Sequence, residues 1–155
     1  MSIRYYEDFK VGDRFTSAGL TMTESAIIDF ARQWDPQPFH TDVEFAKKWT
    51  FGGLIASGLH TMAVTLRLWL DQGVFRSCSL GSPGIGEVQF PRPVRPGDTL
   101  RVVTDIAELR ISASKPENPC AREISSASSY RSSPINAAAS PCRPRLPRAS
   151  TRARW

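Results

Sequence analysis

The hydrophobic periodicity that a packed core requires stops at residue 111 of this 155-residue chain. Before that point, apolar residues recur at helical or strand spacing between clear turn signals. From residue 112 onward Ser, Ala, Pro and Arg dominate, and six of the chain's twelve prolines lie there. Such a segment cannot offset its ordering entropy by apolar burial, because the backbone alone costs roughly 1–2 kcal/mol per residue. We therefore expect one folded domain over residues 1–111 and a disordered tail over residues 112–155.

The net positive charge of the chain belongs to this tail. Residues 1–111 carry 12 Lys and Arg against 13 Asp and Glu, whereas residues 112–155 carry 8 against 2. A nucleic-acid-binding domain needs a basic stripe on a folded face. Because residues 1–111 offer none, we expect no nucleic-acid partner.

The cysteines and the apolar runs indicate the compartment. Cys78, Cys120 and Cys142 are odd in number and widely spaced, which fits neither a disulfide framework nor a zinc site. No apolar run is long enough for a membrane span, and residues 5–8 are not the start of a signal peptide. We expect a cytoplasmic protein with no membrane partner.

The first half of the domain is predicted to contain a strand and two short helices. A turn at residues 11–13 precedes a strand over residues 14–21. Thr23 can cap the first helix, whose predicted apolar face is Ile27, Ile28, Ala31 and Trp34 and which Pro36 ends. A capping box over residues 41–44 then predicts a second helix, with Phe45, Ala46 and Trp49 turned inward.

The second half is predicted to contain a longer helix and two strands. The helix runs from Ser57-Gly58 to about Asp71, and Gly73 stops it. It is apolar on most sides, so we expect it to be buried. Strands are predicted over residues 86–94 and 99–109, with a turn at Pro96-Gly97-Asp98 and alternating apolar residues along the second strand.

The segment from Asp35 to His40, with sequence DPQPFH, is the strongest candidate for chemistry. It carries a carboxylate and an imidazole on a backbone stiffened by Pro36 and Pro38, each of which fixes its own φ and restricts the residue before it. Side chains held in this way suit acid–base work at one small site.

Each candidate residue also has a purely structural interpretation. Asp35 could be a turn residue before Pro36, and His40 could cap or pack against the following helix. Ser57 could simply cap the long helix, and Gly58 could be a close-packing glycine. His60 is better interpreted as a core histidine than as a catalytic one.

Four motifs in this order resemble the MaoC-like dehydratases, the (R)-specific enoyl-CoA hydratase branch of the hotdog superfamily. They are residues 7–13 (EDFKVGD), 35–42 (DPQPFHTD), 53–58 (GLIASG) and 90–100 (FPRPVRPGDTL). The resemblance covers roughly residues 4–115. It implies an α+β hotdog fold, in which a curved antiparallel sheet wraps a central apolar helix, and usually a homodimer. Because the family has further strands after residue 111, the fold would be incomplete here.

The resemblance also implies an activity, the reversible hydration of a trans-2-enoyl thioester to the (R)-3-hydroxyacyl thioester with no metal and no redox cofactor. His40 would take a proton from water, Asp35 would orient that water and deliver a proton to C2, and Gly58 would stabilise the thioester oxygen. The free amides at a helix N-terminus support this last role independently. The partner would be an acyl-CoA or acyl-carrier-protein thioester. We expect four further residues to bind it: Pro38, Phe39, Phe51 and Ser57. Arg92, Arg95 and Arg101 could meet CoA phosphates or form a solvated face.

The tail suggests a hypothesis about the gene. Codons for residues 138–142 (AASPC) can spell Gly-Glu-Pro-Val one frame over, which is a plausible hairpin turn, so the tail could be an out-of-frame translation of the family's last strands. Two alternatives to a hydratase stay open. One is a hotdog thioesterase, which would need a nucleophile or base carboxylate on the central helix, where residues 59–70 offer only His60. The other is an inactive remnant or acyl-CoA-binding module.

Overall fold

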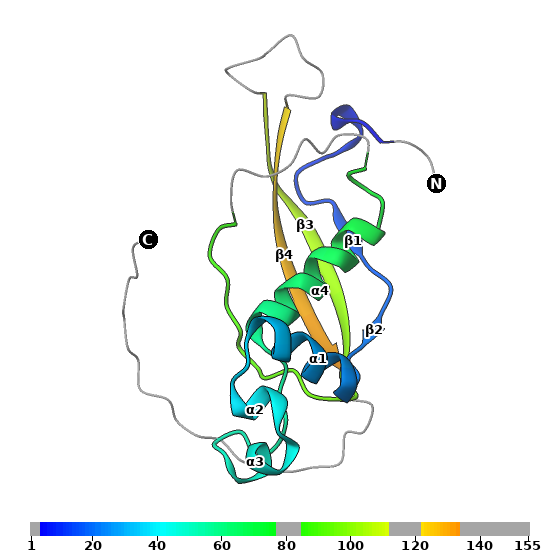
Figure 1. The fold of residues 1–155 in the computed structure, drawn as a ribbon. Coiled ribbons are helices and arrows are strands. Elements are labelled where there is room, and N and C mark those ends of the chain that lie inside the picture. The colour runs from blue at the N-terminus through cyan, green and yellow to red at the C-terminus, as the bar shows by residue number, and fades with distance from the viewer. Residues whose placement is uncertain (1–3, 77–84, 112–121, 134–155) are drawn as a thin grey trace.

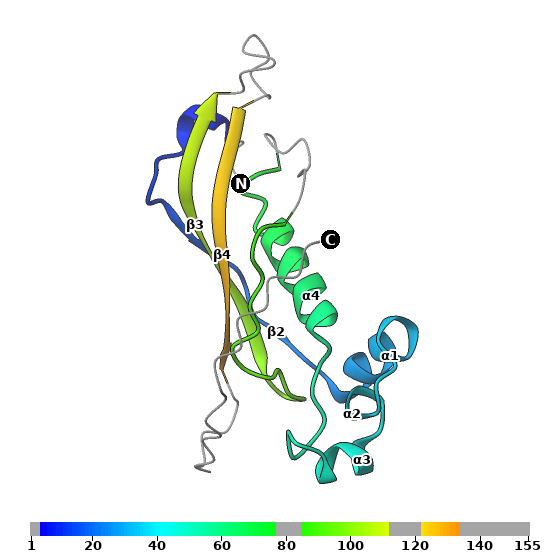
Figure 2. The same cartoon turned by 90° about the vertical axis from the view of Figure 1, so that its left-hand side faces the viewer.

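The computed structural model describes residues 4–76, 85–111 and 122–133. One long helix, α4 (Gly58–Asp71), lies along one face of an antiparallel sheet, and three shorter helices gather at one end of it (Figures 1 and 2). These are α1 (Glu24–Trp34), α2 (Pro38–Thr41) and α3 (Val43–Lys48), and a 3₁₀ turn, η1 (Tyr6–Asp8), precedes the sheet. The α+β class predicted from the sequence is confirmed. None of the helices described is long and apolar enough to cross a membrane.

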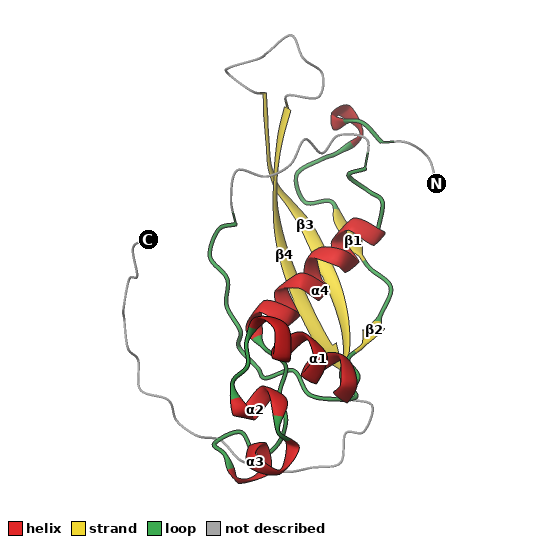
Figure 3. Ribbon diagram, in the orientation of Figure 1, coloured by secondary structure: helices red, strands yellow, loops and turns green. Residues whose placement is uncertain are grey.

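The sheet is built around strand β3 (Thr99–Ile111). One edge of β3 pairs with β1 (Arg14–Thr16) and β2 (Leu20–Thr21), and the other edge pairs with β4 (Arg122–Ser133), all antiparallel (Figure 3). Phe15 lies opposite Thr104 in this register, and Leu20 lies opposite Leu100. The predicted turn before β3 is present, with Gly97 at φ 90° and a hydrogen bond from the Asp98 amide to the Arg95 carbonyl.

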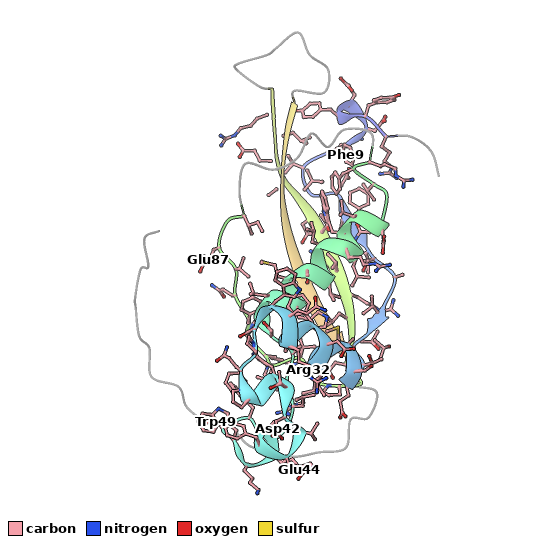
Figure 4. The ribbon with its side chains drawn as sticks, viewed as in Figure 1. Phe9, Arg32, Asp42, Glu44, Trp49 and Glu87 are labelled. Atoms are coloured by element: carbon pink, nitrogen blue, oxygen red, sulfur yellow. The ribbon has the colours of Figure 1, made fainter. Side chains whose placement is uncertain are left out.

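The core lies between β3 and α4. Leu100, Val102, Thr104 and Ile106 alternate along β3 and are at most 1% exposed, which confirms the predicted alternation. They pack toward the inner face of α4, and a smaller aromatic cluster around Phe9 and Phe75 closes the far end (Figure 4). Burying each large apolar side chain is worth about 1.5–3 kcal/mol, so this interface stabilises the fold.

The strand predicted over residues 14–21 is broken into β1 and β2. At the break, the Ser17 amide donates to the Val102 carbonyl, and the Ser17 hydroxyl accepts from the Val102 amide, each at 2.9 Å. The side-chain oxygen therefore takes a position that a backbone carbonyl would hold in an uninterrupted ladder. The ladder resumes at Leu20.

The expectation of disorder after residue 111 is wrong for Arg122–Ser133, which forms β4. A ladder is made by backbone groups, so a Ser-rich sequence can pair wherever a strand edge is free, and the second edge of β3 is such an edge. Residues 112–121 and 134–155 lie outside the described part, as do the three cysteines. The domain boundary at residue 111 therefore stays a prediction.

The strand predicted over residues 86–94 is not present. Within the described ranges these residues join no ladder, and Ile85, Val88 and Phe90 are 70%, 44% and 49% exposed. Pro91 and Pro93 cannot donate to a ladder, and no described strand runs beside this segment to accept it. Glu87, which lies on this segment, is labelled to the left of β4 in Figure 4.

Helix α4 starts and ends where the sequence predicts, but its complete burial is wrong. His60, Thr61, Val64 and Leu68 are buried, whereas Leu59, Leu66 and Leu70 are 50–57% exposed. The described strands cover only one side of the helix, so its opposite side faces outward. We call Leu59, Leu66 and Leu70 the outer face of α4.

The short helices differ from prediction in detail. Thr23 caps α1 as expected, its hydroxyl accepting from the Ala26 amide, but Trp34 is 67% exposed and does not join the core. Asp42, not Thr41, caps α3 by accepting from the Phe45 amide, because Thr41 still belongs to α2. Of the residues expected to turn inward on α3, Ala46 is buried, whereas Phe45 and Trp49 are substantially exposed.

Candidate active site

The junction between α1 and α2 sets the backbone of the candidate site. Asp35 caps the C-terminus of α1, its amide donating to the Ala31 carbonyl, and its φ of −153° leaves the helical region before Pro36. Pro38 then occupies the first turn of α2, where its missing N–H costs nothing. This sharp turn brings the side chains of Asp35 and His40 to the same place, as the sequence predicts.

His40 is fixed by a backbone carbonyl. Its ring is buried, and Nδ1 lies 2.7 Å from the Ile55 carbonyl oxygen. A carbonyl only accepts, so Nδ1 carries the hydrogen, and Nε2 of the neutral ring is left as a proton acceptor. Nε2 lies 3.4 Å from Oδ2 of Asp35. The site therefore has a proton acceptor directed at a carboxylate.

Both oxygens of Asp35 accept hydrogen bonds. Gln37 Nε2 donates to Oδ1 at 2.8 Å, and the Ser57 hydroxyl donates to Oδ2 at 2.6 Å. Burial raises the pKa of the Asp35 carboxyl, but the hydrogen bonds from Ser57 and Gln37, with the nearby His40, outweigh burial and leave that pKa below its ordinary value. Asp35 is therefore ionised at neutral pH.

The N-terminus of α4 borders this pair. Ser57 is its N-cap, 1% exposed, and its hydroxyl accepts from the Leu59 amide at 3.2 Å. Gly58 follows, and among the described residues none accepts a hydrogen bond from its amide. A first-turn amide of this kind favours negative charge, since the helix dipole points its positive end there.

Phe90 covers Gly58 from the other side. A Cβ built on Gly58 would lie 3.0–3.3 Å from three atoms of the Phe90 ring, so only glycine gives the ring this close approach. The sequence did not single out Phe90, because its segment is 32 positions further along the chain and was expected to be a strand. Gln37 and the Ile55 carbonyl were also missed as contacts of the site.

The two aromatic residues that were expected to bind substrate, Phe39 and Phe51, lie one behind the other beside His40. Phe39 contacts the His40 ring edge-on, with centroids 4.4 Å apart, and Phe51 lies behind it at 6.3 Å from Phe39. Trp49 stacks on Phe39 at the outer end of α3 (Figure 4). Phe39 thus adjoins the site, whereas Phe51 reaches it only through Phe39.

Two other candidates lie elsewhere. His60 stacks on Phe30 with centroids 4.4 Å apart, burial lowers its pKa, and its Nδ1 has no hydrogen-bond partner among the described residues. It is a core histidine, as expected, although it is not fully satisfied. Arg95, considered for CoA phosphates, donates to the Phe51 carbonyl at 2.6 Å and so anchors the loop before α4.

The site has no cluster of metal ligands within the described ranges, since no three His, Cys, Asp or Glu side chains converge there. A cavity of about 560 Å³ opens elsewhere, between the β1–β2 segment and the C-terminal half of α4. Its walls include Arg14, Ser17, Arg67 and Gln72 but neither Asp35 nor His40. The acid–base pair and this cavity are therefore separate features.

Comparisons with known proteins point to one family. The family model of the MaoC-like domain matches residues 9–123. The crystal structure of a MaoC-like dehydratase from Rhodospirillum rubrum superposes with a TM-score of 0.68 at 39% identity, covering 83% of this chain and 86% of that one. An R-hydratase of Pseudomonas aeruginosa, PhaJ1, has a TM-score of 0.50 at 27% identity, covering 67% and 65%.

A curated relative has a named activity. It is the 3-hydroxybutyryl-CoA dehydratase of Methylorubrum extorquens, 31% identical over an alignment of 118 residues, which covers 70% of this chain and 68% of that protein. Together with the helix on its antiparallel sheet and the matched length of the family model, these similarities identify the fold as a hotdog. The chain belongs to the family of MaoC-like dehydratase domains.

Proposed function

We propose that this chain catalyses the reversible addition of water to a trans-2-enoyl thioester, giving the (R)-3-hydroxyacyl thioester. The observation that carries the proposal is the 3.4 Å approach of His40 Nε2, a proton acceptor, to the ionised carboxylate of Asp35. The names of the Methylorubrum and Pseudomonas relatives, a dehydratase and an R-hydratase, support the same reaction and its stereochemistry.

The first step forms the C3–O bond. A water held between His40 Nε2 and Asp35 Oδ2 gives one proton to Nε2 while its oxygen bonds to C3 of the enoyl group. The electron pair of the C2–C3 double bond moves toward the thioester oxygen. The amide of Gly58 stabilises the charge that develops on this oxygen, in the way that backbone donors of an oxyanion hole do.

The second step protonates C2. Asp35 is ionised and has no proton of its own to give, so the proton that it delivers is the one taken from water. It passes from His40 Nε2 to Asp35 Oδ2, which lie 3.4 Å apart, and then to C2. One water is consumed, both side chains return to their starting states, and dehydration is the same path in reverse.

The contacts around the pair support a position for the substrate. The acyl thioester lies between the α4 N-terminus and the α2 segment, where Phe39 borders it. Pro38 and Phe51 act more remotely, because Pro38 shapes α2 and Phe51 packs behind Phe39. The acyl group is carried on CoA or on an acyl carrier protein. The active form of the protein is a cytoplasmic homodimer, in which a second copy covers the outer face of α4.

The experiment is hydration of crotonyl-CoA by the purified chain, followed as the enoyl-thioester absorbance falls. A dehydrogenase specific for one enantiomer of 3-hydroxybutyryl-CoA then identifies the product. We expect turnover and the (R) product. Absence of turnover in soluble, folded protein, or an (S) product, would refute the proposal.

One observation favours a second candidate, an inactive remnant or acyl-CoA-binding module. The outer face of α4 is about half exposed and residues 85–93 lack a neighbouring strand in the described structure, which suits an incomplete sheet. Binding of butyryl-CoA without turnover of crotonyl-CoA would favour this candidate. A thioesterase is less well supported, since the one carboxylate of α4, Asp71, lies at its last residue and pairs with Arg67.

A further inference from the structure

The hydroxyl of Ser57 joins two parts of the site that are distant in sequence. Its oxygen lies 2.6 Å from Asp35 Oδ2 and 3.2 Å from the Leu59 amide nitrogen. A carboxylate only accepts, so the single hydroxyl proton points to Asp35, and a lone pair accepts from Leu59. At 1% exposure, Ser57 makes these bonds away from competing water.

This geometry differs from ordinary helix capping elsewhere in the chain. Thr23 caps α1 by the same kind of bond, from the Ala26 amide, but its other hydrogen-bond contact is the exposed Ser25 hydroxyl, not a carboxylate. A cap that also donates to a partly buried carboxylate does more than end a helix. The two hydrogen bonds, from the Leu59 amide to the Ser57 hydroxyl and from this hydroxyl to Asp35, strengthen one another because the amide polarises the hydroxyl toward the carboxylate.

We propose that Ser57 is a positioning residue for the hydration reaction: its hydroxyl fixes the Asp35 carboxylate against the first turn of α4 and touches no substrate atom. This assignment replaces the substrate-binding role expected from the sequence, and it rests on the hydratase function proposed above. Through Ser57, the group that handles the proton and the Gly58 amide that faces the thioester oxygen are held at one fixed separation.

Ser57 also favours the ionised form of Asp35. Of the donors to this carboxylate, Ser57 lowers its pKa most, against the opposing effect of burial. The titratable group that faces Asp35 from α2 is His40, and α4 contributes the hydroxyl and uncharged first-turn amides. Losing the hydroxyl therefore raises the pKa of Asp35 and shifts the acid limb of the pH–rate profile to higher pH.

Three substitutions separate positioning from capping. Ser57→Thr keeps a hydroxyl that can make both bonds. Ser57→Ala removes the bond to Asp35 and the cap. Ser57→Gly removes the bond to Asp35 but retains much of the capping, because glycine is tolerated at an N-cap. If Ser57 only capped α4, Ser57→Gly would behave like the wild-type chain.

We expect kcat for crotonyl-CoA to fall about 10- to 100-fold in both Ser57→Ala and Ser57→Gly, because this is the range for losing a hydrogen bond to a charged group. We expect KM to change little. Both variants should show the acid limb displaced upward, and Ser57→Thr should restore rate and profile. In an Asp35→Asn background, Ser57→Ala should cost much less than it does alone. Thr23→Ala is the control, expected to lower stability without displacing the profile.

If the wild-type chain is active and Ser57→Gly has the same kcat and pH profile, the positioning role is overturned and the hydratase proposal is left intact. Lack of activity in the wild type would overturn the hydratase proposal instead. NMR titration of the Asp35 carboxyl then tests the hydrogen bond from Ser57 directly. A pKa that rises in Ser57→Gly supports the hydrogen bond from Ser57 to Asp35 even in an inactive chain, and an unchanged pKa contradicts both this bond and the positioning role.

Discussion

Nδ1 of His40 lies 2.7 Å from the carbonyl oxygen of Ile55, so a backbone group on a neighbouring segment decides which ring nitrogen carries the hydrogen. The consequence is chemical as well as structural. With Nδ1 protonated, Nε2 of the neutral ring is a base, and it points at Asp35. The loop before α4 therefore fixes the tautomer of His40 and supplies the Ser57 hydroxyl, and the Gly58 amide follows at the first residue of α4.

The contact between Phe90 and Gly58 gives the first prediction. We expect Gly58→Ala to reduce turnover at least tenfold, because the added methyl and the displaced ring crowd the amide. The free energy of unfolding should change by no more than about 1 kcal/mol, since alanine favours the helix and the Phe90 ring is free to move outward. Steady-state kinetics and urea unfolding measure the two effects.

A second substitution tests the cause. Phe90→Ala should recover part of the activity lost in Gly58→Ala, because it removes the atoms that the new methyl meets. Gly86→Ala is the matched control, since a Cβ there meets nothing within 4 Å. Unchanged turnover in Gly58→Ala would argue against a substrate group beside this amide.

His60 makes stability depend on pH. Burial lowers its folded pKa, so the unfolded chain binds more protons than the folded chain below the ordinary value of 6.5. The stability that the neutral ring contributes is thus present above pH 6.5 and is lost as the pH falls below it. We expect His60→Phe, which keeps an aromatic ring against Phe30, to flatten this dependence.

The measurement is the urea midpoint of both proteins at pH 7.5 and 5.5. The wild-type chain should lose more stability between these two values than His60→Phe loses. Equal losses would mean that the imidazole is not shielded from water in the folded protein.

Two leucines on α4 test which side of the helix is covered. Leu68 is 3% exposed and Leu66 is 53% exposed. We expect Leu68→Ala to cost about 2–5 kcal/mol of unfolding free energy, and Leu66→Ala to cost about 0.5 kcal/mol or less in the monomer. If a second copy covers the outer face, Leu66→Ala should also weaken self-association, which sedimentation at several concentrations would detect. An unaltered oligomeric state would place the homodimer contact elsewhere.

The hypothesis about the reading frame leads to a prediction at the level of the gene. We expect the nucleotide sequence after codon 112 to encode, one frame over, apolar residues at strand spacing. Such residues would suit the exposed outer face of α4 and residues 85–93, with which no described strand pairs. Sequencing the gene decides this, and a shifted frame without apolar alternation would refute the hypothesis.

Local signals predicted much of the fold. Thr23, Ser57 and the Pro96–Asp98 turn act within a few residues of themselves, so their positions followed from the sequence. The same holds for the approach of Asp35 to His40, which the intervening prolines enforce. The alternation along β3 was equally visible, because one face of a half-buried strand must be apolar.

Features that depend on distant partners were not predictable. The Ile55 carbonyl and the Phe90 ring reach the site through tertiary packing, and no local pattern marks either. The exposure of Trp34 and Leu66 depends on which surfaces other strands cover, a property that periodicity does not specify. Strand β4 forms because β3 offers a free edge, although the sequence of residues 122–133 did not itself predict a strand.

The most direct test of the account is crotonyl-CoA hydration by the wild-type chain beside Asp35→Asn, His40→Ala and Asp42→Asn. Asp42 is the matched control, since it is a nearby carboxylate that caps α3, and asparagine also caps well. The account predicts that Asp35→Asn and His40→Ala each lower kcat by about 100-fold or more while Asp42→Asn stays near wild type. Turnover that survives both Asp35→Asn and His40→Ala in folded protein would contradict it.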